Sequence, residues 1–226
     1  MVYTEDGSLM INIIYEDNHL LVVEKPINIP VQADSSHDLD FLTILKDFIK
    51  KRDNKPGNVY LGLIHRLDRP VGGVMVFAKT SKCASRLSEQ VRERILKKEY
   101  YAIVEGKLEK SGVLKDYLLK NSKNNTVYVD KRGKEAILEY NLLEYKNGLS
   151  LVNINLKTGR SHQIRVQFSS RNHPLYGDQR YNKNAIPGQQ IALFAHSLTL
   201  NHPITKQQLK FDIKPKNIYP WNIFNM

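Results

Sequence analysis

Short apolar segments bounded by turn-forming residues constrain the fold of this chain more than any other feature. Two of them open the chain, at residues 10–15 and 20–24, and Asp17 and Asn18 between them indicate a turn. The same pattern predicts further strands along the rest of the chain: residues 60–67, 73–79, 99–105, 127–130, 136–144, 149–156, 191–200 and 208–213.

Helical patterns are fewer. Apolar residues follow a helical period over residues 38–50, Thr80 or Ser81 can cap a second helix, and a short third helix is expected to start near Ser161. Strands dominate and regular strand–helix–strand units are few, so the pattern predicts an α+β fold with a mostly antiparallel, mixed sheet.

The predicted domain organisation is simple. No repeat or low-complexity linker divides the chain, so we expect a single domain over residues 1–226. The stretch of residues 107–134 is rich in lysine and asparagine, and it is predicted to be an exposed, basic hairpin excursion.

The charge of the chain favours a polyanionic partner. Its 226 residues include 34 Lys and Arg against 23 Asp and Glu, which gives a formal net charge of +11. Each phosphate that such a surface neutralises releases condensed counterions, which favours binding to nucleic acid. The alternative is a basic surface that engages no polyanion.

The remaining composition points to a protein of a reducing compartment. The single cysteine, Cys83, cannot form an intramolecular disulfide, and the seven histidines show no zinc-ligand spacing. The opening residues lack a secretory signal, and the apolar runs are too short to cross a bilayer. We therefore expect a cytoplasmic protein with no metal and no membrane partner.

Residues 63–70 place charges at the exit of an apolar predicted strand. Alternation puts Arg66 and Asp68 on one face, and Pro70, which cannot donate to a sheet ladder, should end the strand just after Asp68. A carboxylate flanked by Arg66 and Arg69 would stay ionised and available as a nucleophile or base. The alternative is a surface ion pair of Asp68 with one of these arginines, and spacing does not decide between the two.

A second polar cluster, residues 157–165, opens the short third helix. Ser161 can cap this helix, while Arg160 and Arg165 can each bind a phosphate or carboxylate with two nitrogens. A capped surface helix with hydrated arginines is the alternative.

Two adjacent tyrosines, Tyr100 and Tyr101, follow the basic run of residues 92–98. Alternation places one of them on the core side of a strand and the other on the opposite side. Either could stack on a base or supply a hydroxyl, and packing in the core is the alternative.

Taken together, five segments resemble the signatures of the RluA-type family of RNA pseudouridine synthases, in the family's order: residues 14–26, 65–80, 98–106, 159–166 and 192–203. The resemblance implies the pseudouridine synthase catalytic fold. It also implies an isomerase that converts specific uridines of ribosomal or transfer RNA to pseudouridine. The choice of RNA and of uridine stays open.

The resemblance also implies the residues of the site. In this family the aspartate of the second signature is essential, and here it is Asp68. Tyr100 stands in the place of the active-site tyrosine and Arg165 in that of the active-site basic residue. The residues predicted to bind the substrate are Arg66, Arg69, Arg160, His162, Gln163 and Leu193. The resemblance places Leu193 in the lining of the pocket.

The implied reaction breaks the glycosidic bond of a uridine, turns the base and rejoins it through carbon 5, with no metal or cofactor. The uridine must leave its stack, which is easiest in loops. Asp68 would attack the ribose or the uracil, or act by deprotonation, and these routes stay open. Arg165 would keep Asp68 ionised and oriented, and Tyr100 would stack on the flipped base and could relay a proton. RNA is the implied partner, and we expect monomeric action.

The chain departs from the family pattern in places. Residues 70–73 stand where the family usually shows Thr-Ser-Gly, which removes a loop hydroxyl, and Phe194 and Gln167 stand where histidines are common. Many relatives carry a small RNA-binding domain before the first signature. Here that signature begins within the opening residues, so the resemblance predicts a short form that selects its target through the basic surface of the catalytic domain.

Two other classes of function compete with this interpretation. A non-catalytic RNA-binding or assembly factor could share the fold, but Asp68, Tyr100 and Arg165 argue against it because a binding protein does not need this acid. A glycoside hydrolase also cleaves at an anomeric carbon. It usually needs two cooperating carboxylates, and the sequence offers only one convincing acid.

Overall fold

The computed structural model describes residue 7 and residues 10–226. Its contacts group the chain into two compact units. Unit 1 comprises residues 1–97 and 197–213, and unit 2 comprises residues 98–196 and 214–226. Each unit is described by itself, and the single domain expected from the sequence stays a prediction.

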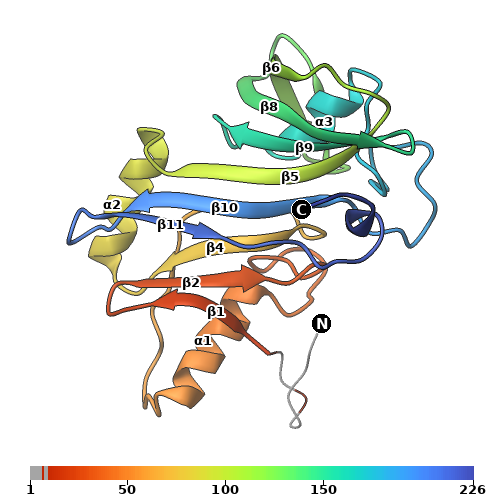
Figure 1. Cartoon of the computed structure of the whole chain (residues 1–226). Helices are drawn as coiled ribbons and strands as arrows, with labels where there is room; N and C mark the ends of the chain where they lie inside the picture. Colours follow the sequence, from red (N-terminus) through yellow and green to blue (C-terminus); the bar gives the residue numbers. More distant parts are fainter. Residues whose placement is uncertain (1–6, 8–9) are drawn as a thin grey trace. The chain divides into compact units, whose positions relative to one another are not determined.

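The strands of unit 1 pair in antiparallel fashion. The first three lie side by side in the order β1 (Asn12–Glu16), β2 (Leu20–Lys25) and β4 (Gly72–Ala78) (Figure 1). The two-residue strand β3 (Gly62–Leu63) also pairs with β4. Residues 197–201 of β10 (Leu193–Asn201) belong to this unit and pair with β11 (Gln208–Asp212).

Two capped helices complete unit 1. α1 (Phe41–Arg52) begins after Asp40, whose side chain accepts a hydrogen bond from the amide of Thr43. α2 (Ser81–Arg92) begins after Thr80, whose hydroxyl accepts from the amide of Cys83. Such caps satisfy amides that the first turn leaves unpaired. Thr80 is therefore the cap, rather than Ser81, and α2 packs on the apolar residues of β2 and β4.

The strand predicted over residues 60–67 was largely wrong, because only Gly62 and Leu63 pair with β4. The ring of His65 explains the difference. Its Nε2 accepts from the backbone amide of Val76 in β4 at 3.2 Å. This amide therefore bonds a side chain instead of the carbonyl of a neighbouring strand, and the segment continues towards Asp68 as an irregular loop.

The strands of unit 2 form a sheet in which neighbours are antiparallel. Their order is β5 (Lys97–Glu105), β9 (Leu149–Leu156), β8 (Lys134–Lys146), β6 (Ser111–Asn121) and β7 (Thr126–Val129). The short helix α3 (Gln163–Ser169) lies against this sheet (Figure 1). Its Val166 is buried together with Leu118, Val127 and Ala136 of β6, β7 and β8.

The basic stretch of residues 107–134 contains β6 and β7, which pair with each other around a turn at residues 122–125. β6 also pairs with β8 from Ser111 to Leu118, so it is an inner strand of the sheet. Strands dominate over the three α-helices of the described residues. The architecture is α+β and mostly antiparallel, as the sequence predicted.

Candidate active site

Asp68 lies in a tight turn of unit 1. The carbonyl oxygen of Asp68 accepts from the amide of Val71, three residues later, at 2.9 Å, which closes the turn over residues 68–71. The preceding loop keeps the predicted alternation, because His65 and Leu67 are buried while Arg66 is exposed and Asp68 is half-buried. The turn thus presents the carboxylate at a partly exposed position on a well-anchored backbone.

The two arginines beside Asp68 have exposed side chains. Arg69 forms an ion pair with Asp38, at positions where both side chains are about half exposed. Arg66 is exposed as well. Exposed arginines of this kind suit contact with phosphate.

A buried lysine supports the Asp68 turn from within unit 1. Lys25, at the end of β2, is 0% exposed, and its ammonium donates to the carbonyl oxygens of Pro26, Arg69 and Val71 at 2.8, 3.1 and 2.8 Å. Burial lowers its pKa to about 7, although the charge of Asp68 raises it. Lys25 therefore ties the backbone on both sides of Pro70 to β2 and places a cationic group near the carboxylate of Asp68.

In unit 2, the two adjacent tyrosines of β5 take opposite faces, as alternation predicted. Tyr100 is 6% exposed, on the core side. Tyr101 lies on the other side, stacked on His196 with ring centroids 3.6 Å apart and an interplanar angle of 6°. The Nε2 of His196 bonds the side-chain oxygen of Asn153, which is the cross-strand partner of Tyr101.

Arg165 projects from α3 into a buried ion pair. Its Nε and Nη2 bond the two carboxylate oxygens of Asp178 at 2.9 and 2.7 Å, and both residues are buried. The guanidinium carbon also lies 5.1 Å from the ring centroid of Tyr181, a cation–π distance. Two parallel bonds to a carboxylate fix the plane of an arginine, so Asp178 sets the orientation of Arg165.

The start of α3 differs from the predicted cap. His162, not Ser161, occupies the N-cap position, with a left-handed φ of 50° and no side-chain cap bond. The Oε1 of Gln163 accepts instead, from the amide of Arg160 at 3.1 Å and from the hydroxyl of Thr158 at 2.8 Å. The buried side-chain amide of Gln163 therefore holds the backbone of the turn before α3 in place.

The other residues predicted to bind the substrate have different settings. Arg160 is exposed, and its Nε donates to the carbonyl oxygen of Glu135 at 2.8 Å. Leu193 is buried at the start of β10. Gln167, where a histidine is common in the resembling family, is 0% exposed, and its amide nitrogen lies within hydrogen-bond distance of acceptors on Leu114, Asp116 and Ala136. Gln167 therefore joins α3 to β6 and β8.

Sequence reasoning missed three residues of these surroundings, namely Lys25, Asp178 and Tyr181. Lys25 stood inside the first signature, and a lysine that ends an apolar strand before a proline is a usable signal for a buried cation. Asp178 is 13 residues from its partner Arg165, and nothing local in the sequence marks the pair.

Among residue 7 and residues 10–226, no three His, Cys, Asp or Glu residues are grouped so that they could hold a metal ion. No helix in the same part of the chain is long and apolar enough to span a membrane.

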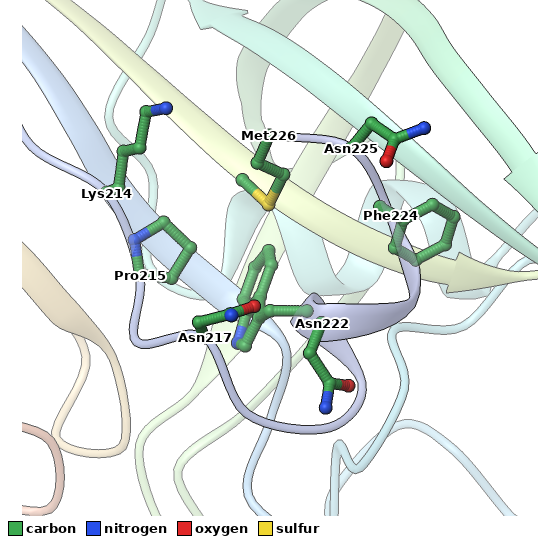
Figure 2. A pocket seen from close by; sticks show the side chains of 8 residues that line it. Lys214, Pro215, Asn217, Asn222, Phe224, Asn225 and Met226 are labelled. Atoms are coloured by element: carbon green, nitrogen blue, oxygen red, sulfur yellow. The ribbon is translucent and has the colours of Figure 1, made fainter.

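A hollow in unit 2 lies along residues 214–226, as Figure 2 shows. One lysine and three asparagines line it together with apolar side chains, and the lining includes no carboxylate side chain and no predicted site residue. The lining residues are Lys214, Pro215, Asn217, Trp221, Asn222, Phe224, Asn225 and Met226.

The chain matches the family model of the RNA pseudouridylate synthases over residues 19–170. It is 34% identical over 211 residues to the ribosomal large subunit pseudouridine synthase C of Buchnera aphidicola subsp. Baizongia pistaciae, covering 87% of this chain and 64% of the relative. It is 38% identical over 181 residues to the protein of the same name from Buchnera aphidicola subsp. Acyrthosiphon pisum, covering 78% of this chain and 56% of that relative. The chain thus spans about 60% of the length of these two relatives.

A third relative is covered more fully. The ribosomal large subunit pseudouridine synthase D of Zymomonas mobilis is 32% identical over 224 residues, which are 93% of this chain and 71% of that protein. Among solved structures, human RNA pseudouridylate synthase domain containing 4 matches with a TM-score of 0.76 at 24% identity, over 91% of this chain and 89% of that one. This likeness confirms the predicted fold.

Proposed function

Because this chain belongs to the RNA pseudouridylate synthase family, we propose that it isomerises specific uridines of ribosomal or transfer RNA to pseudouridine, with Asp68 as the essential residue. The observation that carries the proposal is the match over residues 19–170, which includes Asp68, Tyr100 and Arg165, each in its own signature. The relatives described above are named as ribosomal large subunit enzymes, which makes ribosomal RNA the first substrate to test.

Asp68 is proposed to act on the flipped uridine as a nucleophile or as a base. Its setting supports this role, because the turn that carries it is closed by the Asp68–Val71 hydrogen bond and fastened to β2 by Lys25. The anchored turn holds the carboxylate in one place, as either role requires. A fixed backbone also limits the motion of the attacking group, which contributes to rate.

Tyr100 is proposed to stack on the flipped base and Arg165 to supply the positive charge of the site. The place of Tyr100 in the third signature, within the match over residues 19–170, supports the first role. The ion pair with Asp178 supports the second, because it holds the guanidinium in one plane. A guanidinium fixed in this way loses little conformational entropy when it binds an anion.

The remaining predicted residues are proposed to bind RNA in different ways. The exposed Arg66, Arg69 and Arg160 suit phosphate contacts, and Leu193 suits an apolar contact in the pocket lining. His162 is proposed to contact the substrate directly, while Gln163 acts by shaping the turn that carries Arg160.

The test is pseudouridine formation in RNA isolated from cells that lack this gene. Ribosomal and transfer RNA are incubated separately with the purified protein, and pseudouridine is mapped at single-nucleotide resolution. The proposal expects new pseudouridine at one or a few positions in one class of RNA. Tight RNA binding without any new pseudouridine in either class would favour the non-catalytic RNA-binding factor instead.

We also propose that the protein acts as a monomer in the cytoplasm. One chain carries all five signatures, so one copy suffices for the proposed site. The single cysteine, Cys83, is buried and free, which fits a reducing compartment. Light scattering of the protein with and without RNA tests the first part, and a stable dimer would contradict it.

A further inference from the structure

The loop between α3 and β10 folds back so that Tyr181 lies against α3. Asp178 organises this loop, because its Oδ1 accepts from the amides of Arg180 and Tyr181 at 3.0 and 3.3 Å. The amide of Asn182 donates to the backbone carbonyl of Asp178 at 3.0 Å. The carboxylate that holds Arg165 therefore also fixes the backbone at Tyr181.

The hydroxyl of Tyr181 joins two segments that are far apart in the sequence. It accepts from the amide of Val127 at 2.9 Å and lies 2.7 Å from Nδ1 of His162. A phenol has one proton and two lone pairs. The Val127 amide uses one lone pair, so the proton and the second lone pair remain, and the hydroxyl can bond Nδ1 of His162 in either ring tautomer.

The Val127 amide belongs to an edge of the sheet. β7 is the last strand in the order of the unit 2 sheet, and Val127 lies opposite Lys120 of β6. An edge strand presents every second amide away from its neighbour. The hydroxyl of Tyr181 satisfies such an amide, and so it fastens the β6–β7 hairpin to the loop of Asp178.

The ring of Tyr181 adds a second contact. The guanidinium of Arg165 lies over it at 5.1 Å, while Asp178 holds the edge of the same guanidinium. Burial raises the pKa of Tyr181, although the Val127 amide and the charge of Arg165 oppose the rise. The hydroxyl therefore keeps its proton near neutral pH and can donate it.

We propose that Tyr181 is a positioning residue of the site: its ring and hydroxyl hold Arg165 and His162 in their working orientations and brace them against the β6–β7 hairpin. This inference rests on the proposed function only for its kinetic readout. Two features of one side chain carry it. The ring supports the guanidinium, and the hydroxyl joins His162 to Val127.

The kinetic test separates the two features. Tyr181→Phe keeps the ring and removes the hydroxyl, whereas Tyr181→Leu removes both. Tyr176→Phe is the matched control, because its hydroxyl lies in the same loop and accepts from Gln189 at 2.9 Å, with no bond to α3. Steady-state kcat and KM for RNA are measured at a temperature where melting curves show all variants folded.

The proposal expects a graded loss of kcat with KM changed less than about twofold. The loss should be about fivefold to tenfold for Tyr181→Phe and about a hundredfold for Tyr181→Leu, since small misplacements of a catalytic group cost factors of this size. Tyr176→Phe should stay within about twofold of wild type. Equal rates for Tyr181→Phe, Tyr181→Leu and wild type would overturn the proposal.

A second readout does not depend on activity. In nuclear magnetic resonance spectra, the Nε–H proton of Arg165 should exchange slowly in wild type and in Tyr181→Phe, and at least about tenfold faster in Tyr181→Leu. Unchanged exchange in Tyr181→Leu would overturn the positioning role even if the kinetics changed. If the wild type makes no pseudouridine, the proposed function fails, and this measurement still decides the role of Tyr181.

Discussion

The ammonium of Lys25 donates a hydrogen bond to the carbonyl oxygen of Arg69, the residue directly after Asp68, over a distance of 3.1 Å. The two residues are 44 positions apart in the sequence. With its other bonds to Pro26 and Val71, this lysine makes the position of the Asp68 turn depend on a charge buried at the end of β2.

Replacing Lys25 should therefore disturb the Asp68 turn. In Lys25→Met three buried or partly buried carbonyl groups lose their donor, and such a loss costs about 1–3 kcal/mol for each group that stays unsatisfied. We expect a lower free energy of unfolding and reduced pseudouridine formation. Denaturant unfolding and single-turnover rates measure the two effects. Lys82→Met, at an exposed position of α2, controls for the loss of one charge.

The pH dependence of this effect has a definite sign. The pKa of Lys25 is lowered to about 7 in the folded protein, against about 10.4 in an unfolded chain. Between these values the unfolded chain binds more protons, so the stability that Lys25 contributes falls as the pH drops towards 7 and is constant below it. From pH 7 to 9, the stability of wild type relative to Lys25→Met should rise, by at most about 1.4 kcal/mol per pH unit. A constant difference would contradict the lowered pKa.

Substitutions at Tyr100 separate stacking from proton transfer. Tyr100→Phe keeps an aromatic face, so RNA affinity should change little if stacking is the main role. A proton relay through the hydroxyl would instead lower kcat by about a hundredfold or more. Tyr100→Leu should weaken both binding and rate. Tyr101→Phe, on the opposite face of β5, is the control, and a larger effect there than at Tyr100 would contradict the assignment.

The β6–β7 hairpin is predicted to contribute to RNA binding through its lysines. Lys120 and Lys123 of the hairpin are exposed, and so is Lys131, two residues after the end of β7. If each neutralises a phosphate, changing all three to glutamine should weaken binding and reduce the slope of log K against log salt by about two.

A charge-matched control for the hairpin is available in unit 1. Lys50, Lys51 and Lys55, at and just after the end of α1, are also exposed and give the same change in net charge. Filter-binding titrations at several salt concentrations compare the two triple variants. Equal changes in slope would mean that net charge acts without regard to position, and the hairpin would lose its role.

Much of the strand pattern was predictable from the sequence, because alternation and turn residues are local signals. The predicted strand at residues 149–156 coincides with β9 (Leu149–Leu156), and Tyr100 and Tyr101 take opposite faces as their spacing requires. The strand at residues 60–67 failed for a non-local reason. His65 bonds the amide of Val76, and no pattern within residues 60–67 specifies that partner.

Residues of the candidate site could be predicted only where a signature includes them. Resemblance predicted roles for Asp68, Tyr100 and Arg165. Spacing alone left open a surface ion pair for Asp68, core packing for Tyr100, and a capped surface helix with a hydrated arginine for Arg165. Asp178 and Tyr181 were missed because their roles arise from partners elsewhere in the chain. Ser161 was predicted as a cap because serine favours that position, but the left-handed His162 moved the start of α3.

The most direct test of the central claim compares wild type with Asp68→Asn on RNA from cells that lack the gene. Single-turnover pseudouridine formation is measured at the uridine that wild type modifies, with RNA affinity and melting temperature measured in parallel. The claim predicts normal folding and near-normal RNA binding in Asp68→Asn, with a rate reduced by at least about a thousandfold, as for other residues that carry out the chemistry. A folded Asp68→Asn protein that forms pseudouridine at a rate within about tenfold of wild type would contradict it.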